Sequence, residues 1–179
     1  MYGKGYIEFA SMKADSKTIA YIDGANLHKG VESSLWKLDY HKFRFWIRQK
    51  FNVADAHLFI GLIPKHANLY TALQNIGYTL VFKEVVYDGD GRVKGNCDAD
   101  LVLRATRDYF EQGITSVVLV SSDGDYAPLI KFWLEKKVRC AIISPAPTNK
   151  CSVLLKRTGA PIVYLEEVRH KLWYQPKPK

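Results

Sequence analysis

The sequence of 179 residues has few cysteines, no long apolar run and little glycine or proline. The three cysteines, Cys97, Cys140 and Cys151, are an odd number without C-x-x-C spacing, which argues against a disulfide framework or a zinc site. They favour a reducing, cytoplasmic compartment. No apolar run reaches about 18 residues, and the first residues lack the apolar stretch of a secretory signal, so neither a membrane-spanning helix nor secretion is expected.

Familiar catalytic and nucleotide-binding motifs are also missing. The chain has no P-loop, no G-x-G-x-x-G and no G-x-S-x-G, and its five histidines show no H-x-x-x-H spacing. With 12 Gly, 7 Pro and 47% hydrophobic residues, the composition excludes a disordered or collagen-like chain. We expect one globular domain at 18–173, with an arm at 1–17 and a tail at 174–179.

Acidic residues are scarce in the last third of the chain. Residues 128–179 hold 11 Lys and Arg but 3 Asp and Glu, whereas residues 1–127 hold 15 of each. The net charge of +8 therefore comes from one region, which favours a polyanionic partner such as nucleic acid. The candidate binding track is a basic run, equally readable as a solvated helix face, that comprises Lys131, Lys136, Lys137 and Arg139.

Hydrophobic periodicity alternates between strands and helices along the chain. The expected strands are 19–22, 56–62, 79–86, 116–120, 138–143 and 162–165. One expected helix begins near Leu27, and the others span 41–51, 68–76, 98–112, 126–135 and 152–156. Residues 87–92 are expected to form a hairpin or an exposed loop. This alternation predicts an α/β fold, a three-layer sandwich with a mainly parallel sheet, whose site lies at the carboxyl ends of the strands.

Carboxylates stand at the positions where such a fold gathers its site. Asp23 follows the first strand, Asp123 and Asp125 follow the strand 116–120, and Asp98 and Asp100 open a helix. Converging carboxylates repel one another unless a cation joins them, and Mg²⁺ prefers oxygen ligands. The acids therefore indicate a divalent metal site.

Structural readings of the same residues stay open at this point. Asp23 with Gly24 also suits an ordinary turn, and Asp98, Asp125 and Asn26 also suit helix caps. Asp100 also suits a first-turn acid that the helix dipole favours.

Three blocks together resemble the NYN domains, with closest similarity to the LabA-like branch of the PIN-like nuclease superfamily. They are Tyr21–Leu27 (YIDGANL), Lys94–Leu103 (KGNCDADLVL) and Val118–Tyr126 (VLVSSDGDY), and the resemblance extends over about 18–170. Two positions depart from the family pattern, since Ser122 stands where Gly is usual and Cys97 where an aliphatic residue is usual.

The resemblance implies a metal-dependent ribonuclease in which an ion activates the attacking water. By its motifs, Mg²⁺ or Mn²⁺ is held by Asp23, Asp98, Asp123 and Asp125, with Asp100 as a further ligand and Asn26 orienting Asp23 or a metal-bound water. Lys94, Ser121 and Ser122 are expected, with the basic run, to bind the nucleic acid. RNA, preferably single-stranded, is the expected partner, no membrane is involved, and a homo-oligomer is left open.

Two other functions are compatible with the residues. The first is a catalytically silent, basic module of the same fold that binds RNA or protein. The second is a phosphotransferase or phosphatase of the haloacid dehalogenase type, which needs a second Asp two residues after its nucleophile. Gly24 and Ala25 follow Asp23 here, which argues against the latter.

Overall fold

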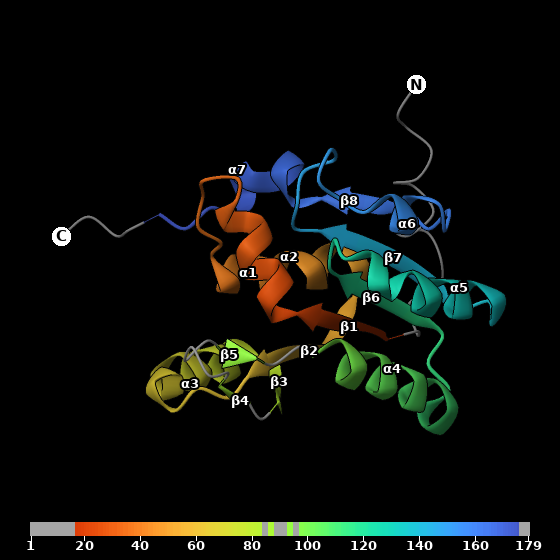
Figure 1. Ribbon diagram of the computed structural model, residues 1–179, viewed down its shortest axis with the longest axis horizontal. Helices are drawn as coiled ribbons and strands as arrows, with labels where there is room; N and C mark the ends of the chain where they lie inside the picture. Colours follow the sequence, from red (N-terminus) through yellow and green to blue (C-terminus); the bar gives the residue numbers. More distant parts are fainter. Residues whose placement is uncertain (1–16, 84–85, 88–92, 95–96, 176–179) are drawn as a thin grey trace.

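A six-stranded, all-parallel sheet forms the centre of the protein in the computed structural model, which describes residues 17–83, 86–87, 93–94 and 97–175. Its strands lie in the order β3-β2-β1-β6-β7-β8 (Figure 1). They are β1 (Thr18–Asp23), β2 (Val53–Gly61), β3 (Thr79–Lys83), β6 (Ser116–Val120), β7 (Arg139–Ser144) and β8 (Ile162–Tyr164). The predicted parallel α/β sheet is thus confirmed.

Helices cover both faces of this sheet. On one face lie α1 (Gly24–Glu32), α2 (Tyr40–Phe51), α3 (Ala67–Ile76) and α7 (Arg169–Leu172), and on the other α4 (Asp98–Gln112), α5 (Ala127–Glu135) and α6 (Val153–Lys156). Three short 3₁₀ helices join them: η1 (Pro64–His66), η2 (Gly124–Tyr126) and η3 (Leu165–Val168). None of the helices in the described ranges has the length and apolarity needed to cross a membrane.

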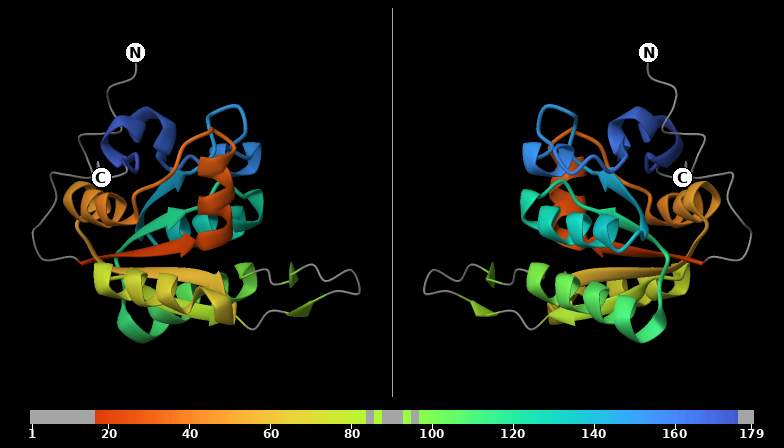
Figure 2. Two further views of the ribbon diagram at one scale, coloured as in Figure 1. Left: turned by 90° about the vertical axis from the view of Figure 1, so that its left-hand side faces the viewer. Right: turned by 90° about the vertical axis from the view of Figure 1, so that its right-hand side faces the viewer.

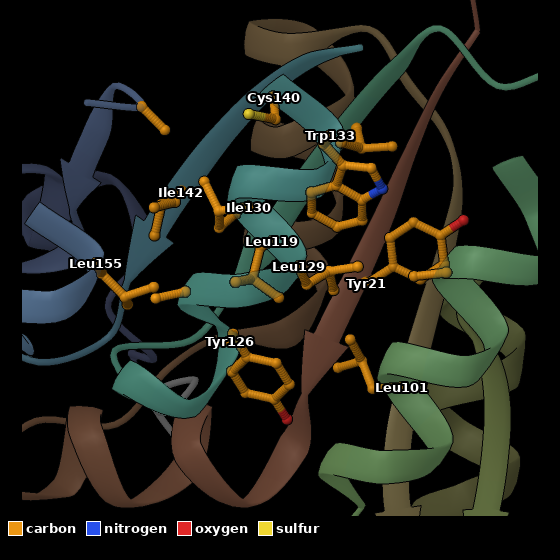
Figure 3. Close-up of a cluster of buried hydrophobic side chains, with 14 of the residues drawn as sticks. Tyr21, Leu101, Leu119, Tyr126, Leu129, Ile130, Trp133, Cys140, Ile142 and Leu155 are labelled. Carbon is orange, nitrogen blue, oxygen red and sulfur yellow. The ribbon is translucent and has the colours of Figure 1, made fainter. Parts of the chain in front are cut away.

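Each face of the sheet has its own core. Successive residues of β1 alternate between them, so that Tyr21 packs under α4 and α5 while Ile22 packs under α1 and α2. Figure 3 shows the α4–α5 core, where the Trp133 and Tyr21 rings stack with centroids 5.8 Å apart. Burial on both faces explains why the strands are continuous apolar runs.

Several boundaries differ from the sequence prediction, and two of the differences lie close to the candidate site. The expected strand 79–86 ends at Lys83, and Val86–Tyr87 forms a separate strand, β4, that pairs antiparallel with β5 (Val93–Lys94). This pairing agrees with the hairpin option, although residues 88–92 lie outside the described part. The first helix begins at Gly24 rather than near Leu27, because the Asp23 carboxylate itself caps it.

Helix α1 crosses the carboxyl edge of the sheet, which we define as the edge where the parallel strands end (Figures 1 and 2). A Cβ on Gly24 would lie 2.8 Å from the Phe59 carbonyl oxygen of β2. A Cβ on Gly30 would lie 2.9 Å from the Pro145 carbonyl carbon, directly after β7. Only glycine permits contacts this close, so the two glycines hold α1 against this edge.

Candidate functional site

The candidate site lies where the order of the strands reverses. From β1 the chain proceeds outward to β2 and β3, whereas β6, adjacent to β1 on its other side, leads outward to β7 and β8. Asp23 ends β1, and Ser121 and Ser122 follow β6 directly. Such a switch point is the usual ligand site of an open parallel sheet, since the connections diverge there and leave a crevice.

Three carboxylates converge at this point. Asp98, the first residue of α4, and Asp123 and Asp125 of the β6–α5 connection each place one carboxylate oxygen so that all three oxygens lie within 4.8 Å of one another. Asp98 and Asp123 are half-buried, and Asp125 is exposed. An all-oxygen set with an open side suits Mg²⁺ or Mn²⁺, which bind few carboxylates and keep several waters.

The connection after β6 is held in shape by its own side chains. The Asp125 N–H donates to Asp123 Oδ1 at 3.0 Å, and the Asp123 N–H donates to Ser121 Oγ at 3.1 Å. Gly124 is required here because a Cβ would lie close to the Ser152 hydroxyl before α6. Asp123 is thus both the cap of η2 and a candidate ligand, whereas the cap predicted from the sequence, Asp125, lies inside η2.

Asn26 joins the two halves of the site. Its backbone N–H donates to Asp23 Oδ1 at 2.9 Å, while its side-chain oxygen accepts from the N–H and the hydroxyl of Ser122 at 2.9 and 2.8 Å. The Ser122 hydroxyl, absent in the usual glycine, therefore adds a hydrogen bond. The Asn26 side chain positions the β6 connection, whereas its backbone positions Asp23.

A buried tyrosine links Asp23 to Asp98. The Tyr126 hydroxyl lies 2.5 Å from Asp98 Oδ1 and 3.2 Å from Asp23 Oδ2, so its single proton serves one carboxylate at a time. Figure 3 shows this ring among the residues of the α4–α5 core. Asp23 is therefore not one of the three converging carboxylates, and its oxygens are already bonded to Asn26 and Tyr126.

Asp23 and Tyr126 have perturbed proton affinities. Burial raises the pKa of Asp23, and the nearby Asp98 and Asp123 carboxylates raise it further against the opposing effect of its hydrogen bonds. Burial and the Asp23 and Asp98 carboxylates raise the pKa of Tyr126, which keeps its hydroxyl protonated. A cation bound between the carboxylates would relieve this repulsion.

Neighbouring residues take other positions. Asp100 forms an ion pair with Lys83 at the end of β3, 2.9 Å apart, and does not join the three carboxylates. Burial raises the pKa of the Cys97 thiol to about 11, so this residue is a neutral apolar contact before α4. Lys94 lies in β5, and its side chain lies outside the described part of the structure.

The predicted basic track lies away from the carboxylates. Lys136 and Lys137 follow the end of α5, and Arg139 begins β7, which places them at the amino edge of the parallel sheet. Lys131 lies midway along α5 and is exposed. The fold does not bring this track to the site, and its role in binding nucleic acid stays a prediction.

Sequence reasoning missed Tyr126 and Lys83. Tyr126 is the last residue of the block Val118–Tyr126 and the first of the expected helix 126–135, and no role in the site was predicted for it from the sequence. A tyrosine directly after an Asp-Gly-Asp run is the signal that could have identified it. Lys83 carries no local signal, because only the register of β3 beside β2 brings it to Asp100.

Comparisons with known proteins agree with this geometry. The family model described as NYN domain matches residues 17–159. A crystal structure of a protein of unknown function from Vibrio parahaemolyticus is similar over 91% of this chain and 100% of that chain, with a TM-score of 0.71 and 21% sequence identity. At that identity the likeness shows the fold alone. No curated protein matches the chain significantly.

Proposed function

The chain belongs to the NYN domain family, and from that premise we propose that it is a metal-dependent ribonuclease of the LabA-like branch that hydrolyses single-stranded RNA. The family is part of the PIN-like nuclease superfamily, whose members generally use divalent metal ions, and NYN proteins typically bind RNA. The observation that carries the proposal is the convergence of Asp98, Asp123 and Asp125 within 4.8 Å at the switch point of the sheet.

Each residue of the site has a role in this proposal. Asp98, Asp123 and Asp125 would hold Mg²⁺ or Mn²⁺, which when bound lowers the pKa of a water and stabilises charge on the phosphate. Asp23 and Tyr126 position Asp98, since the shared hydroxyl fixes the orientation of its carboxylate. Asn26 and Ser122 keep the β6 connection in register with α1, so that the ligands keep their spacing.

Cations on the carboxyl edge support an RNA substrate. Lys29 of α1, Lys65 of η1 and Lys150 after β7 are exposed on the segments that border this edge. These three side chains would attract the phosphates of a polyanionic strand to this edge. An unpaired strand suits the crevice, because its backbone can approach the carboxylates without a complementary strand.

The test is cleavage of end-labelled single-stranded RNA in Mg²⁺, in Mn²⁺ and in chelator. Asp98→Asn, purified in parallel, controls for a contaminating nuclease. We expect cleavage by the parent with either ion, none in chelator, and little by the variant. RNA binding without cleavage under every condition would favour the alternative, a catalytically silent RNA-binding module.

A further inference from the structure

A cavity of about 260 Å³ lies beside the start of α1, between the end of β2 and α3. We call it the α1–α3 cavity. Its floor is apolar, because Leu58 and Leu73, which line it, are buried. Leu69, which is 48% exposed, and His28, whose side chain is 63% exposed, lie at its mouth. The cavity therefore opens to solvent and has an apolar floor.

The α1–α3 cavity is adjacent to the carboxylates. Gly24, which lines it, is bonded directly to Asp23. Gly61 lines it too, and pairs in the sheet with Lys83, whose ammonium binds Asp100. Within the described ranges, the start of α1 and the ends of β2 and β3 lie between the cavity and the candidate site. A ligand bound at the carboxylates could extend into the cavity.

The wall of the cavity is fixed in advance by a buried tyrosine. The Tyr70 hydroxyl accepts from the Ile63 N–H at 2.9 Å and donates to the Gly61 carbonyl at 3.0 Å. Tyr70 is 8% exposed and packs edge-on against Phe82, with centroids 4.9 Å apart. The connection after β2 is therefore held open without a ligand, which lowers the cost of binding one.

The size and the lining of the cavity suit one flat ring. At 260 Å³ it is smaller than the roughly 300–1,000 Å³ of sites for drug-sized ligands. Its lining includes the rings of His28, His66, Tyr40 and Tyr70 beside aliphatic side chains. Single-stranded nucleic acids are bound in this way, with unpaired bases stacked on aromatic and imidazole rings.

We propose that the α1–α3 cavity binds one nucleobase of single-stranded RNA, that of a nucleotide next to the phosphodiester that would face the metal ion held by Asp98, Asp123 and Asp125. This inference rests on the proposed function, because the carboxylate site supplies the phosphate position. A base in a duplex is stacked and paired and could not enter, so the cavity selects for unpaired strands.

A second cavity adjoins the α1–α3 cavity. It has a volume of about 300 Å³, shares His28 and Tyr40 with the first, and includes the Trp36 ring. The Arg169 guanidinium lies 5.9 Å from the centre of that ring. The two cavities thus adjoin along α1 at His28 and Tyr40, and the lining of the second also includes Lys37 and Glu32.

The test uses methyl NMR of the full chain with Asp123→Asn, in Mg²⁺, so that RNA is bound but not cut. Addition of an unstructured uridine hexamer should shift the methyl signals of Ile60, Ile63 and Leu69. Inorganic polyphosphate, which has the charge but no base, should leave them in place. Methyls of Ile114, next to the amino edge, serve as the reference. No shift with RNA, or the same shift with polyphosphate, would overturn the proposal.

A pair of variants gives an independent readout. Ile63 lines the cavity, whereas Leu62, its neighbour, is 45% exposed and does not. Ile63→Trp should fill the cavity and weaken binding of the hexamer about tenfold, while Leu62→Trp should leave binding within twofold. Equal affinities for the two variants would contradict the proposal. Uridine monophosphate, tested alongside, should bind far more weakly than the hexamer, since the occupant is a base of RNA rather than a free nucleotide.

These outcomes separate the two proposals. A protein that binds the hexamer through the cavity but cleaves no RNA would refute the nuclease and keep the base site. A protein that cleaves RNA without cavity shifts would refute the base site and keep the nuclease.

Discussion

Two buried tyrosines each hold a carboxylate of helix α4, and the two pairs differ in their charge. Tyr21 donates to Asp108 Oδ2 at 2.9 Å, where Arg104 Nε lies 2.8 and 2.9 Å from the two carboxylate oxygens and Gln112 donates at 2.8 Å. At the other end of α4, Tyr126 is shared between Asp98 and Asp23. The charges that act on Asp23 are those of Asp98 and Asp123, both negative.

The comparison distinguishes a carboxylate whose charge is neutralised from one whose neighbouring charges are also negative. Asp108, 2% exposed, carries a charge that Arg104 neutralises, so the pair is complete without a ligand. At Asp23 the neighbouring charges add to the effect of burial and raise its pKa. An arrangement that is unfavourable for the empty protein is expected where a cation binds, and the predictions below test this difference.

The largest expected effect is on cleavage. Asp123→Asn keeps the oxygen that accepts from the Asp125 N–H, so the fold should survive while the ligand charge is lost. The cleavage rate should fall by about 10²–10³-fold, because one charge that binds the ion is removed. Asp55→Asn, at an exposed position near the start of β2, is the matched control and should cleave at the parental rate. Parental cleavage by both variants would remove Asp123 from the site.

Substitution at the other pair should affect stability instead. Asp108→Asn leaves the Arg104 guanidinium and the Tyr21 hydroxyl without their buried partner charge, and should cost about 2 kcal/mol of unfolding free energy. Glu111→Gln, which breaks the exposed Arg107 pair on the same helix, should cost less than about 0.5 kcal/mol. Urea unfolding measures both. Cleavage per folded molecule should be unchanged in both variants, and a selective loss with Asp108→Asn would contradict a structural role.

A smaller difference in the free energy of unfolding is expected between the variants that lack the hydroxyl of Tyr126 or of Tyr21. Tyr126→Phe removes the hydroxyl that Asp23 and Asp98 share, and should cost about 2 kcal/mol in chelator. Tyr21→Phe leaves Asp108 bonded to Arg104 and Gln112, and should cost about 1 kcal/mol. Mn²⁺ should recover part of the loss for Tyr126→Phe only. Equal losses with no effect of Mn²⁺ would argue that the two pairs are equivalent.

The smallest expected effect has a pH dependence. Because the pKa of Asp23 is raised by folding, the folded protein holds this proton more tightly than the unfolded chain, and stability falls as pH rises above about 4. Asp23→Asn removes that loss, and its amide can donate to the Tyr126 hydroxyl oxygen. In chelator the variant should be more stable than the parent by on the order of 1 kcal/mol at neutral pH. The gain should disappear below about pH 4. A constant difference across this range would assign it to another cause.

Much of the fold follows from local signals in the sequence. The helix 98–112 and the strand 116–120 were predicted to the residue, since apolar stripes, Asp98 at the start and Gly113 at the end mark them clearly. The end of β3 at Lys83 was not, because apolar residues resume at Val85 and Val86 and only pairing with β2 decides where the strand stops. The start of α1 at Gly24 was not predicted either, because glycine usually argues against a helix.

Strand ends and sequence motifs predicted part of the site. These signals indicated Asp98, Asp123 and Asp125, which the fold brings together. They did not show that Asp23 and Asp100 differ from these three acids. The Asp23 carboxylate turns toward Tyr126, and Asp100 pairs with Lys83. The direction of these carboxylates depends on packing between α4 and η2. The basic residues at the end of α5 lie at the amino edge of the sheet because α5 runs away from the site.

Paramagnetic broadening by Mn²⁺ tests the central claim most directly, because it locates the ion without RNA or cleavage. Substoichiometric Mn²⁺ is added to the isotopically labelled parent, and amide signals are compared at the two ends of α4. The account predicts that the signals of Asp98, Asp123 and Asp125 broaden first while those of Arg104 and Asp108 stay sharp. Uniform broadening, or broadening centred on the Asp108 end, would contradict it.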